Sequence, residues 1–225
     1  MLLDLLRGGN ITEIVIGLCV SVFVVFCIIP LHEYAHALVA TKLGDDTARL
    51  SGRLTINPMA HINWIGAFMI LVVGFGYAQP VPVNIRNVKM KNKKLAMALI
   101  ALAGPLSNLF FAVISIILMF VVALILKDNP VAKSFMIFFQ YSALLNINLA
   151  VFNFIPVPPL DGSRILFAIL PTKYYFAVMK YERYILIVVF ALLFFGALTG
   201  PLSMISNAIY SGIFTFFYNL FSLIV

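Results

Sequence analysis

The sequence predicts an all-α polytopic membrane protein, and three observations lead to this fold class. Hydrophobic residues make up 63% of the 225 residues and charged residues 10%, whereas soluble domains carry about 45–50% apolar and 25% charged residues. Several apolar stretches exceed the roughly 18 residues that cross a bilayer core. The ionisable residues gather mainly between these stretches. We therefore expect one transmembrane domain over residues 1–225, embedded in a lipid bilayer as a multi-pass protein of the cell membrane.

About five transmembrane helices are predicted from the apolar runs and from the glycines and prolines between them. Pro30 marks a kink in the first helix, Gly104-Pro105 an interruption of the second, and Gly200-Pro201 the turn between the last two. The predicted helices cover residues 14–42, 95–126, 134–154, 184–198 and 202–225.

A membrane-associated insert, residues 44–94, separates the first two helices and has a different pattern. Residues 47–56 alternate polar and apolar side chains, which predicts a half-buried strand. Residues 79–85 read QPVPVNI, and prolines at alternate positions suit an edge strand or a loop. Residues 64–78 are apolar but short for a spanning helix, which favours an interfacial or re-entrant segment. We expect a β-containing insert that stays on one face of the membrane.

Charge predicts which face this is. If the insert does not cross, 12 of the 15 Lys and Arg residues fall on the side where the first helix ends, and three fall on the other side. Cytoplasmic loops carry the Lys/Arg excess in membrane proteins. The net charge of +7 is therefore attributed to the Lys/Arg excess of cytoplasmic loops, and no nucleic-acid partner is expected. The insert and the end of the first helix are predicted to face the cytoplasm.

The first helix contains the motif H-E-x-x-H as His32, Glu33 and His36. Four residues along an α-helix turn by about 400°, so the two imidazoles point the same way and can bind one ion. The carboxylate of Glu33 lies one position round the helix, where it can take a proton from water without ligating the metal. Histidine and glutamate are costly in lipid unless they function. The motif predicts a hydrolytic zinc site.

A catalytic zinc site needs a third protein ligand, and Asp161 is the best candidate. No cysteine is suitably placed, and the remaining histidine is His61. Asp161 follows the third helix in a loop over residues 155–163, where prolines end the helix and Gly162 permits a turn. The third helix returns toward the face where the first one ends. The sequence thus predicts one zinc ion per chain, held by His32, His36 and Asp161.

Several motifs resemble the site-2 protease family of intramembrane zinc metalloproteases. They are HEYAH, AGPLSN, NFIPVPPLDG, and the insert stretches GRLTINPMAHINWIG and FGYAQPVPVN, which together cover most of residues 30–170. The insert stretches resemble a small branch of the family without PDZ or CBS domains. Ser163 stands where a second glycine after the aspartate is common, a change that we do not expect to abolish activity.

The resemblance implies roles for individual residues. His32, His36 and Asp161 match the zinc ligands, and Glu33 matches the general base. Asn153 matches the asparagine that contacts the substrate backbone or stabilises the oxyanion, with a helix-to-loop cap as the alternative. For Asn108, in AGPLSN, a substrate contact and a buried amide that bridges helices are both open. For His61 we favour a structural or interfacial role over a gate or accessory role.

The function that the resemblance implies is hydrolysis of peptide bonds in or near transmembrane segments, as in regulated intramembrane proteolysis. The expected partner is a transmembrane protein or peptide. Residues 47–56 and 79–85 could bind an unwound substrate as an added strand, or the insert could merely cover the site. Two other classes stay open, a non-proteolytic metal-binding membrane protein and a divalent-metal transporter.

Overall fold

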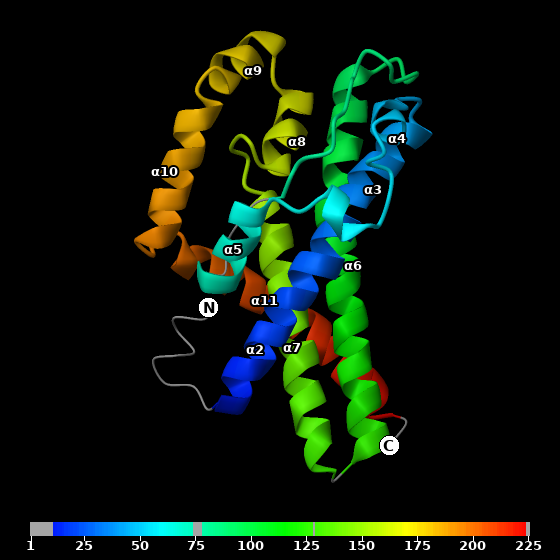
Figure 1. The fold of residues 1–225 in the computed structure, drawn as a ribbon, viewed down its shortest axis with the longest axis vertical. Coiled ribbons are helices and arrows are strands. Elements are labelled where there is room, and N and C mark those ends of the chain that lie inside the picture. The colour runs from blue at the N-terminus through cyan, green and yellow to red at the C-terminus, as the bar shows by residue number, and fades with distance from the viewer. Residues whose placement is uncertain (1–10, 74–77, 128, 224–225) are drawn as a thin grey trace.

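The protein is all-helical in its described part, as Figure 1 shows for a computed structural model. The structure describes residues 11–73, 78–127 and 129–223. Long helices form an upright bundle, and most of the short helices lie toward one end of it (Figure 1). The helices are α2 (Ile11–Phe23), α3 (Ile29–Lys42), α4 (Thr47–Leu50), α5 (Trp64–Val73), α6 (Lys93–Leu126), α7 (Pro130–Asn153), α8 (Asp161–Ile169), α9 (Thr172–Met179), α10 (Glu182–Phe194) and α11 (Thr199–Phe221).

The first long helix contains a π-helical turn, Val24–Ile28, between α2 and α3. Pro30 lacks an N–H and its ring crowds the carbonyl four residues earlier, so a wider turn just before it relieves the crowding. The N–H of Ile29 accordingly bonds back to the carbonyl of Val24. The irregularity predicted near Pro30 is thus a π-turn within a span of 32 residues, Ile11–Lys42.

Helices α6 and α7 form the centre of the bundle. Asn92 caps α6 by accepting a hydrogen bond from Leu95 N, and Asn129 caps α7 through Val131 N. The interruption predicted at Gly104-Pro105 is wrong, because α6 continues through Pro105. At 34 residues, or about 51 Å, α6 extends well beyond a bilayer core of about 30 Å.

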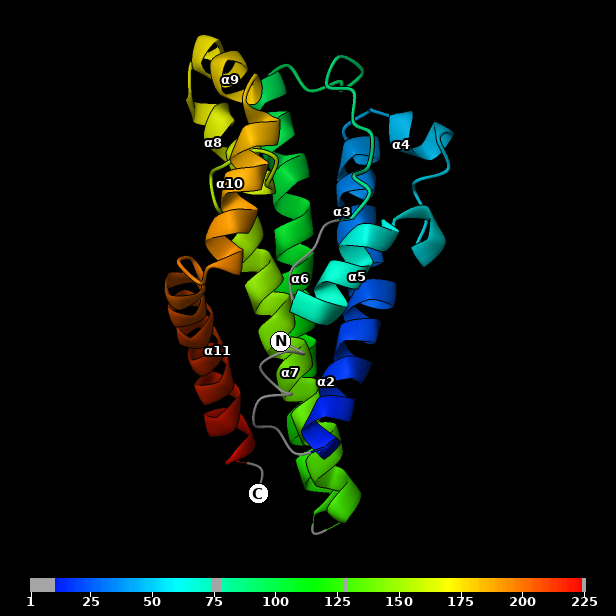
Figure 2. The same cartoon turned by 60° about the vertical axis from the view of Figure 1, so that its left-hand side comes forward.

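The last two helices form a bent pair. Helices α10 and α11 meet at 79°, and Figure 2 shows them on one side of α6 and α7, with α2 and α3 on the other. Three described helices are long and apolar enough to cross a membrane, or four if the bent pair counts as one span. The expected number of five is therefore not supported: α10, with 13 residues, is about 20 Å long and falls short of a bilayer core. The long apolar helices nevertheless indicate an integral membrane protein.

The described residues of the insert contain no strand, so the strand predicted over residues 47–56 is wrong, and residues 79–85 follow the loop alternative to an edge strand. Thr47–Leu50 is helix α4, and residues 78–84 are irregular. The side chain of Asp45 accepts hydrogen bonds from both N–H and Oγ of Thr47, which forms a turn that leads into α4. Alternation over so few residues therefore predicted the wrong conformation, because it does not reveal this local side-chain contact.

After His61 the chain forms helix α5 against the first span and then returns to His61. Helix α5, ten residues long, packs Ala67 and Ile70 against Val25 of the first span. The chain then comes back, because Gln79 N donates to His61 O at 2.9 Å. The side chain of Arg53 bonds to the carbonyls of Gln79 and Pro80. These contacts agree with the predicted re-entrant segment, although residues 74–77 lie outside the described part.

A buried carboxylate joins the end of the insert to the end of α3. Asp45 is fully buried and accepts hydrogen bonds from Asn84 N at 2.6 Å and from the Asn87 side-chain amide at 3.2 Å. Burial alone would raise the pKa of Asp45, but the donors from Thr47, Asn84 and Asn87 outweigh it and lower this pKa from its ordinary value. Lys89 N also donates to Leu43 O. The insert is therefore fixed by polar contacts to the first span.

Candidate active site

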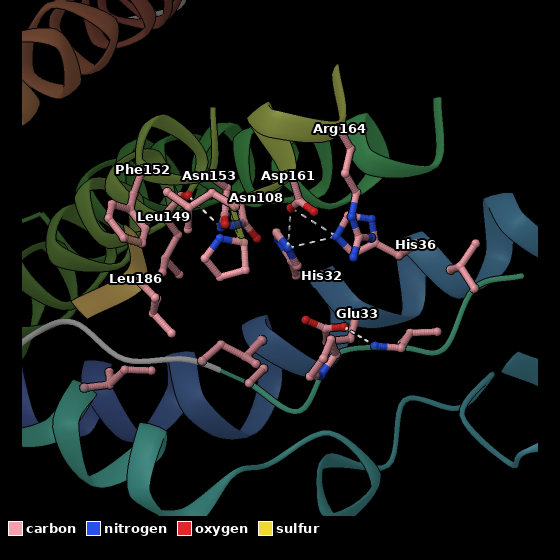
Figure 3. Close-up of a pocket in the computed structure, with 18 residues that line it drawn as sticks. His32, Glu33, His36, Asn108, Leu149, Phe152, Asn153, Asp161, Arg164 and Leu186 are labelled. Atoms are coloured by element: carbon pink, nitrogen blue, oxygen red, sulfur yellow. Dashed lines mark hydrogen bonds and ion pairs between the residues drawn. The ribbon is translucent and has the colours of Figure 1, made fainter. Parts of the chain in front are cut away.

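Two helices bring the three predicted metal ligands together (Figure 3). His32 and His36 project from α3 one turn apart, and Asp161 is the first residue of α8. The Nε2 atoms of the two histidines are 3.1 Å apart. They lie 3.3 and 3.2 Å from Oδ2 of Asp161. All three side chains are buried, so three donor atoms face one another inside the protein.

The spacing of these atoms fits a zinc ion. Ligands about 2.0–2.1 Å from a tetrahedral zinc lie roughly 3.3 Å from one another, and the three donor pairs here are 3.1–3.3 Å apart. Two imidazoles and one carboxylate are also a donor set that catalytic zinc sites use. In the described part of the chain, these are the three acidic, histidine or cysteine side chains grouped closely enough to hold a metal.

Hydrogen bonding prepares His36 to be a ligand. Its Nδ1 lies 2.7 Å from the carbonyl oxygen of Ile100 on α6. A carbonyl oxygen can only accept, so Nδ1 carries the proton and Nε2 keeps its lone pair for a metal. At Asp161, burial would raise the pKa, but the imidazoles of His36 and His32 outweigh it and lower the carboxyl pKa below its ordinary range. The carboxylate is thus ready to ligate.

Helix α6 approaches the histidines closely at Gly104. A Cβ atom added there would lie 2.5 Å from Nε2 of His32 and would overlap Nε2 of His36. Since any side chain would displace the donor atoms, a glycine is required at this position. The Gly104-Pro105 pair therefore marks the wall of the site and not a break in the helix.

A second glycine allows Asp161 to reach the site. Helix α7 ends at Asn153, and the chain turns through residues 154–160 before α8 begins. A Cβ atom at Gly162 would lie 2.5 Å from the carbonyl oxygen of Ile155, so this glycine permits a close backbone approach. Ser163 is buried and its hydroxyl donates to Leu160 O at 2.7 Å. A serine therefore fits where the resemblance suggested a second glycine.

Glu33 lies beside a cavity that also contains the three predicted ligands. Its side chain is buried, and Oε2 accepts a hydrogen bond from Val81 N at 3.1 Å. The cavity has a volume of about 250 Å³. Apolar side chains line much of it, among them Ile29, Ile70, Leu149, Phe152 and Leu186. The cavity thus combines the Glu33 carboxylate, three side chains that could bind a metal, and an apolar wall.

The two asparagines singled out in the sequence also line this cavity. Asn153 donates from Nδ2 to Leu149 O in its own helix at 3.0 Å, which leaves its carbonyl oxygen for another partner. Asn108 is buried, and its Oδ1 has no partner among the described residues. Both side chains thus lie in the wall of the cavity that contains the three predicted ligands.

His61 is not among the cavity-lining residues. It is fully buried just before helix α5, with Nε2 at 2.7 Å from Thr55 O. This position agrees with the structural role favoured from the sequence.

Four contributors to the site were not predicted. The carbonyl of Ile100 and the N–H of Val81 are backbone groups, which leave no signal in a sequence. Gly104 had a signal, a glycine inside a long apolar helix, but it was interpreted as a break. Arg164 lines the cavity, and its signal was its position three residues after Asp161, on the same face of a helix.

A comparison with protein families supports the relationship suggested by the motifs. Residues 121–196 match the model described as Peptidase family M50, the family of site-2 proteases. This segment includes Asp161 and all of α7. The match confirms the predicted resemblance to this family.

Three similar proteins are named as zinc metalloproteases. The chain is 45% identical over 143 residues to "Putative zinc metalloprotease YwhC" of Bacillus subtilis, covering 63% of this chain and 64% of that protein. It is 32% identical over 138 residues to "Putative zinc metalloprotease MJ0611" of Methanocaldococcus jannaschii, covering 60% and 62%. It is 28% identical over 136 residues to "Putative zinc metalloprotease Rip2" of Mycobacterium tuberculosis, covering 59% and 50%.

The chain thus spans less than two thirds of the length of each of these relatives. No solved structure matches the chain. Zinc, the predicted metal, is the metal named in all three relatives.

Proposed function

We propose that the protein is an intramembrane zinc endopeptidase that hydrolyses peptide bonds in or near transmembrane segments of membrane proteins. One observation carries the proposal: His32, His36 and Asp161 place their donor atoms 3.1–3.3 Å apart beside Glu33, in a cavity with an apolar wall. This combination suits a site that binds a hydrophobic peptide and attacks it with water. The names of the relatives support the same activity.

Zinc bound by the three ligands would act as a Lewis acid that polarises the scissile carbonyl and makes water a stronger nucleophile. Glu33 takes the proton from the attacking water and passes it to the leaving amine. The hydrogen bond from Val81 N holds the carboxylate through Oε2, so Oε1 is left for this proton. The bond from His36 Nδ1 to Ile100 O fixes the imidazole in the orientation that binding requires.

Asn153 and Asn108 are proposed to hold the peptide. The free carbonyl oxygen of Asn153 can accept a hydrogen bond from a substrate N–H, and the amide of Asn108 can donate to a substrate carbonyl or to a developing oxyanion. An extended peptide presents both kinds of backbone group. The asparagines therefore complement a substrate that has been unwound.

The site is proposed to open toward the cytoplasm. Most Lys and Arg residues lie at the end of the bundle where α3 ends, α6 begins, and α8 and α9 pack, which is the distribution that the positive-inside rule assigns to the cytoplasm. The Gln79 N to His61 O bond returns the chain after α5 to that same end. Val81 lies against Glu33, which favours a role for the insert in covering the site.

Thiol labelling tests this orientation. Ser51, Lys91 and Lys133 are exposed, so each is replaced by cysteine in a chain that lacks Cys19 and Cys27. An impermeant thiol reagent is expected to label positions 51 and 91 in inverted vesicles and position 133 in intact cells. Labelling of positions 51 and 91 on opposite faces would show that the insert crosses the membrane.

Peptide cleavage tests the activity itself. Wild type, E33Q and D46N are purified in detergent and incubated with a transmembrane substrate, and their zinc content is measured in parallel. Removing a general base costs on the order of 10²–10⁴-fold in rate, so E33Q should bind zinc but barely cleave. D46N changes a solvent-exposed carboxylate and should cleave like wild type. Equal cleavage by wild type and E33Q would exclude Glu33 as the base.

The transporter alternative receives little support. A path for a divalent cation needs ionisable or polar ligands across the membrane, and helices α6, α7 and α11 contain no Asp or Glu. Zinc uptake into proteoliposomes in the absence of peptide cleavage would favour a transporter.

A further inference from the structure

We infer that Arg164 determines substrate specificity: it selects peptides that carry an acidic side chain on the side of the scissile bond facing α8. The inference rests on the proposed protease function and specifies its substrate class. The substrate would have an apolar segment on one side of the cut and a carboxylate on the other.

The position of Arg164 supports this role. It lines the cavity and lies three residues after Asp161 on α8, so the two side chains share a face of the helix. In Figure 3, Arg164 lies at the opposite end of the site from Leu186 and Phe152, with Asp161 between them. A peptide that crosses the site would therefore meet apolar side chains at one end and a guanidinium at the other.

The charge of Arg164 is not neutralised within the described part of the protein. Its guanidinium is not within ion-pair distance of Asp161, whose Oδ2 lies against both imidazoles. The other carboxylate of the cavity, Glu33, accepts its hydrogen bond from Val81 N. Arg164 is the one Lys or Arg among the described residues that line the cavity. A half-buried cation without an acidic neighbour is a site for a carboxylate from outside.

The chemistry of arginine favours such a ligand. Its planar guanidinium donates two parallel hydrogen bonds to a carboxylate, which lysine does not. The low dielectric of a partly enclosed cavity strengthens this pair relative to one in water. The same positive charge would repel a basic side chain of the substrate. Selection by Arg164 thus acts both for acidic and against basic peptides.

The test uses a set of transmembrane substrates that differ at one residue. The cleavage position is first located by mass spectrometry. Asp, Asn or Lys is then placed at each of the four positions on the cytoplasmic side of the cut, and kcat/KM is measured for wild type, R164E, R164Q, R164K and K173E. Lys173 is exposed on the neighbouring helix α9, so K173E matches the charge reversal outside the cavity.

Wild type and K173E should prefer Asp over Lys by about tenfold at one or two positions. R164K should keep a weaker preference, R164Q should lose it, and R164E should reverse it. The zinc content of all variants should equal that of wild type.

Two results would overturn the inference while leaving the protease function intact: wild type that cleaves the Asp and Lys substrates equally, or R164Q and R164E that slow all substrates by the same factor. The second result would show that Arg164 orients every peptide. If wild type cleaved none of the substrates, the proposed function would fail and the inference with it.

Discussion

The metal-binding region and the insert are built differently, although both contact Glu33. In the first, helices α3, α6 and α8 meet at close range, with Gly104 against the histidines and Gly162 against the backbone of residues 154 and 155. In the second, residues 44–94 are held by hydrogen bonds that Asp45 accepts and by others that Arg53 and Gln79 donate. Close packing of helices fixes the predicted metal ligands, whereas hydrogen bonds fix the insert that lies beside Glu33.

This difference suggests that the two regions have different tasks. Ligand atoms must keep their separations within a few tenths of an ångström, and close-packed helices provide such precision. The insert has to remain near Glu33 and still admit a peptide. Hydrogen bonds at its ends can hold it in place while its middle, near Val81, adjusts. Changes in the two regions should therefore have different consequences.

The largest effect is expected from G104A. A Cβ atom at this position would displace Nε2 of both histidines, so zinc content should fall more than tenfold and cleavage should be lost. Zinc is measured by atomic absorption on purified protein. The matched control is G212A in α11, where an added Cβ meets nothing within 4 Å, and it should bind zinc like wild type. Full zinc content in G104A would contradict the tight wall inferred for the metal site.

A smaller effect, confined to the insert, is expected from D45N. The pKa of Asp45 is lowered in the folded protein, so the carboxylate stabilises the insert above its unfolded pKa of about 3.9. This stabilisation is lost as the pH falls further, toward the lowered folded value. Hydrogen bonds to a charged group contribute about 1.5–3 kcal/mol each. D45N should lose part of this contribution at neutral pH.

Limited proteolysis in detergent measures this effect. Wild-type residues 84–90 should resist cleavage at pH 7 and become sensitive below about pH 4. D45N should be sensitive at pH 7, with little further change on acidification, and should retain zinc. A D45N insert as resistant as wild type at pH 7 would argue against Asp45 as its anchor.

The smallest effect is expected from R53A, which removes the bonds to the carbonyls of Gln79 and Pro80. Hydrogen bonds of this kind contribute about 0.5–1.5 kcal/mol, so kcat/KM should fall roughly two- to tenfold at unchanged zinc content. The control is R49A, because Arg49 forms an exposed ion pair with Asp46 at 3.0 Å, and such pairs contribute little. Identical kinetics for R53A and R49A would show that these bonds do not position the insert.

The same contrast explains what could be predicted from the sequence. Helical periodicity and a motif within five residues located His32 and His36, and the return of the third helix placed Asp161 near them. The first predicted strand of the insert was wrong because Asp45 accepts hydrogen bonds from Thr47 in a turn that leads into helix α4, a contact that alternation does not reveal. The bent pair α10–α11 was counted as two spans because a bend of 79° has the same sequence signal as a loop.

Two features of the site could not be assigned to it from the sequence. Gly104 lies 68 positions after His36, and only packing shows that the two touch. The hydrogen bonds from Val81 N and to Ile100 O involve backbone groups, which every residue type supplies. Contacts between residues distant in the sequence and hydrogen bonds of backbone groups therefore could not be predicted without a structure.

The central claim is that side chains from two distant segments hold one zinc ion, and metal content tests it most directly. Purified wild type, H36A, D161A and E33Q are compared by atomic absorption after identical zinc loading and removal of excess metal. We predict one zinc per chain in wild type and E33Q, and a loss of more than tenfold in H36A and D161A. Zinc content in D161A equal to that of wild type would contradict the account.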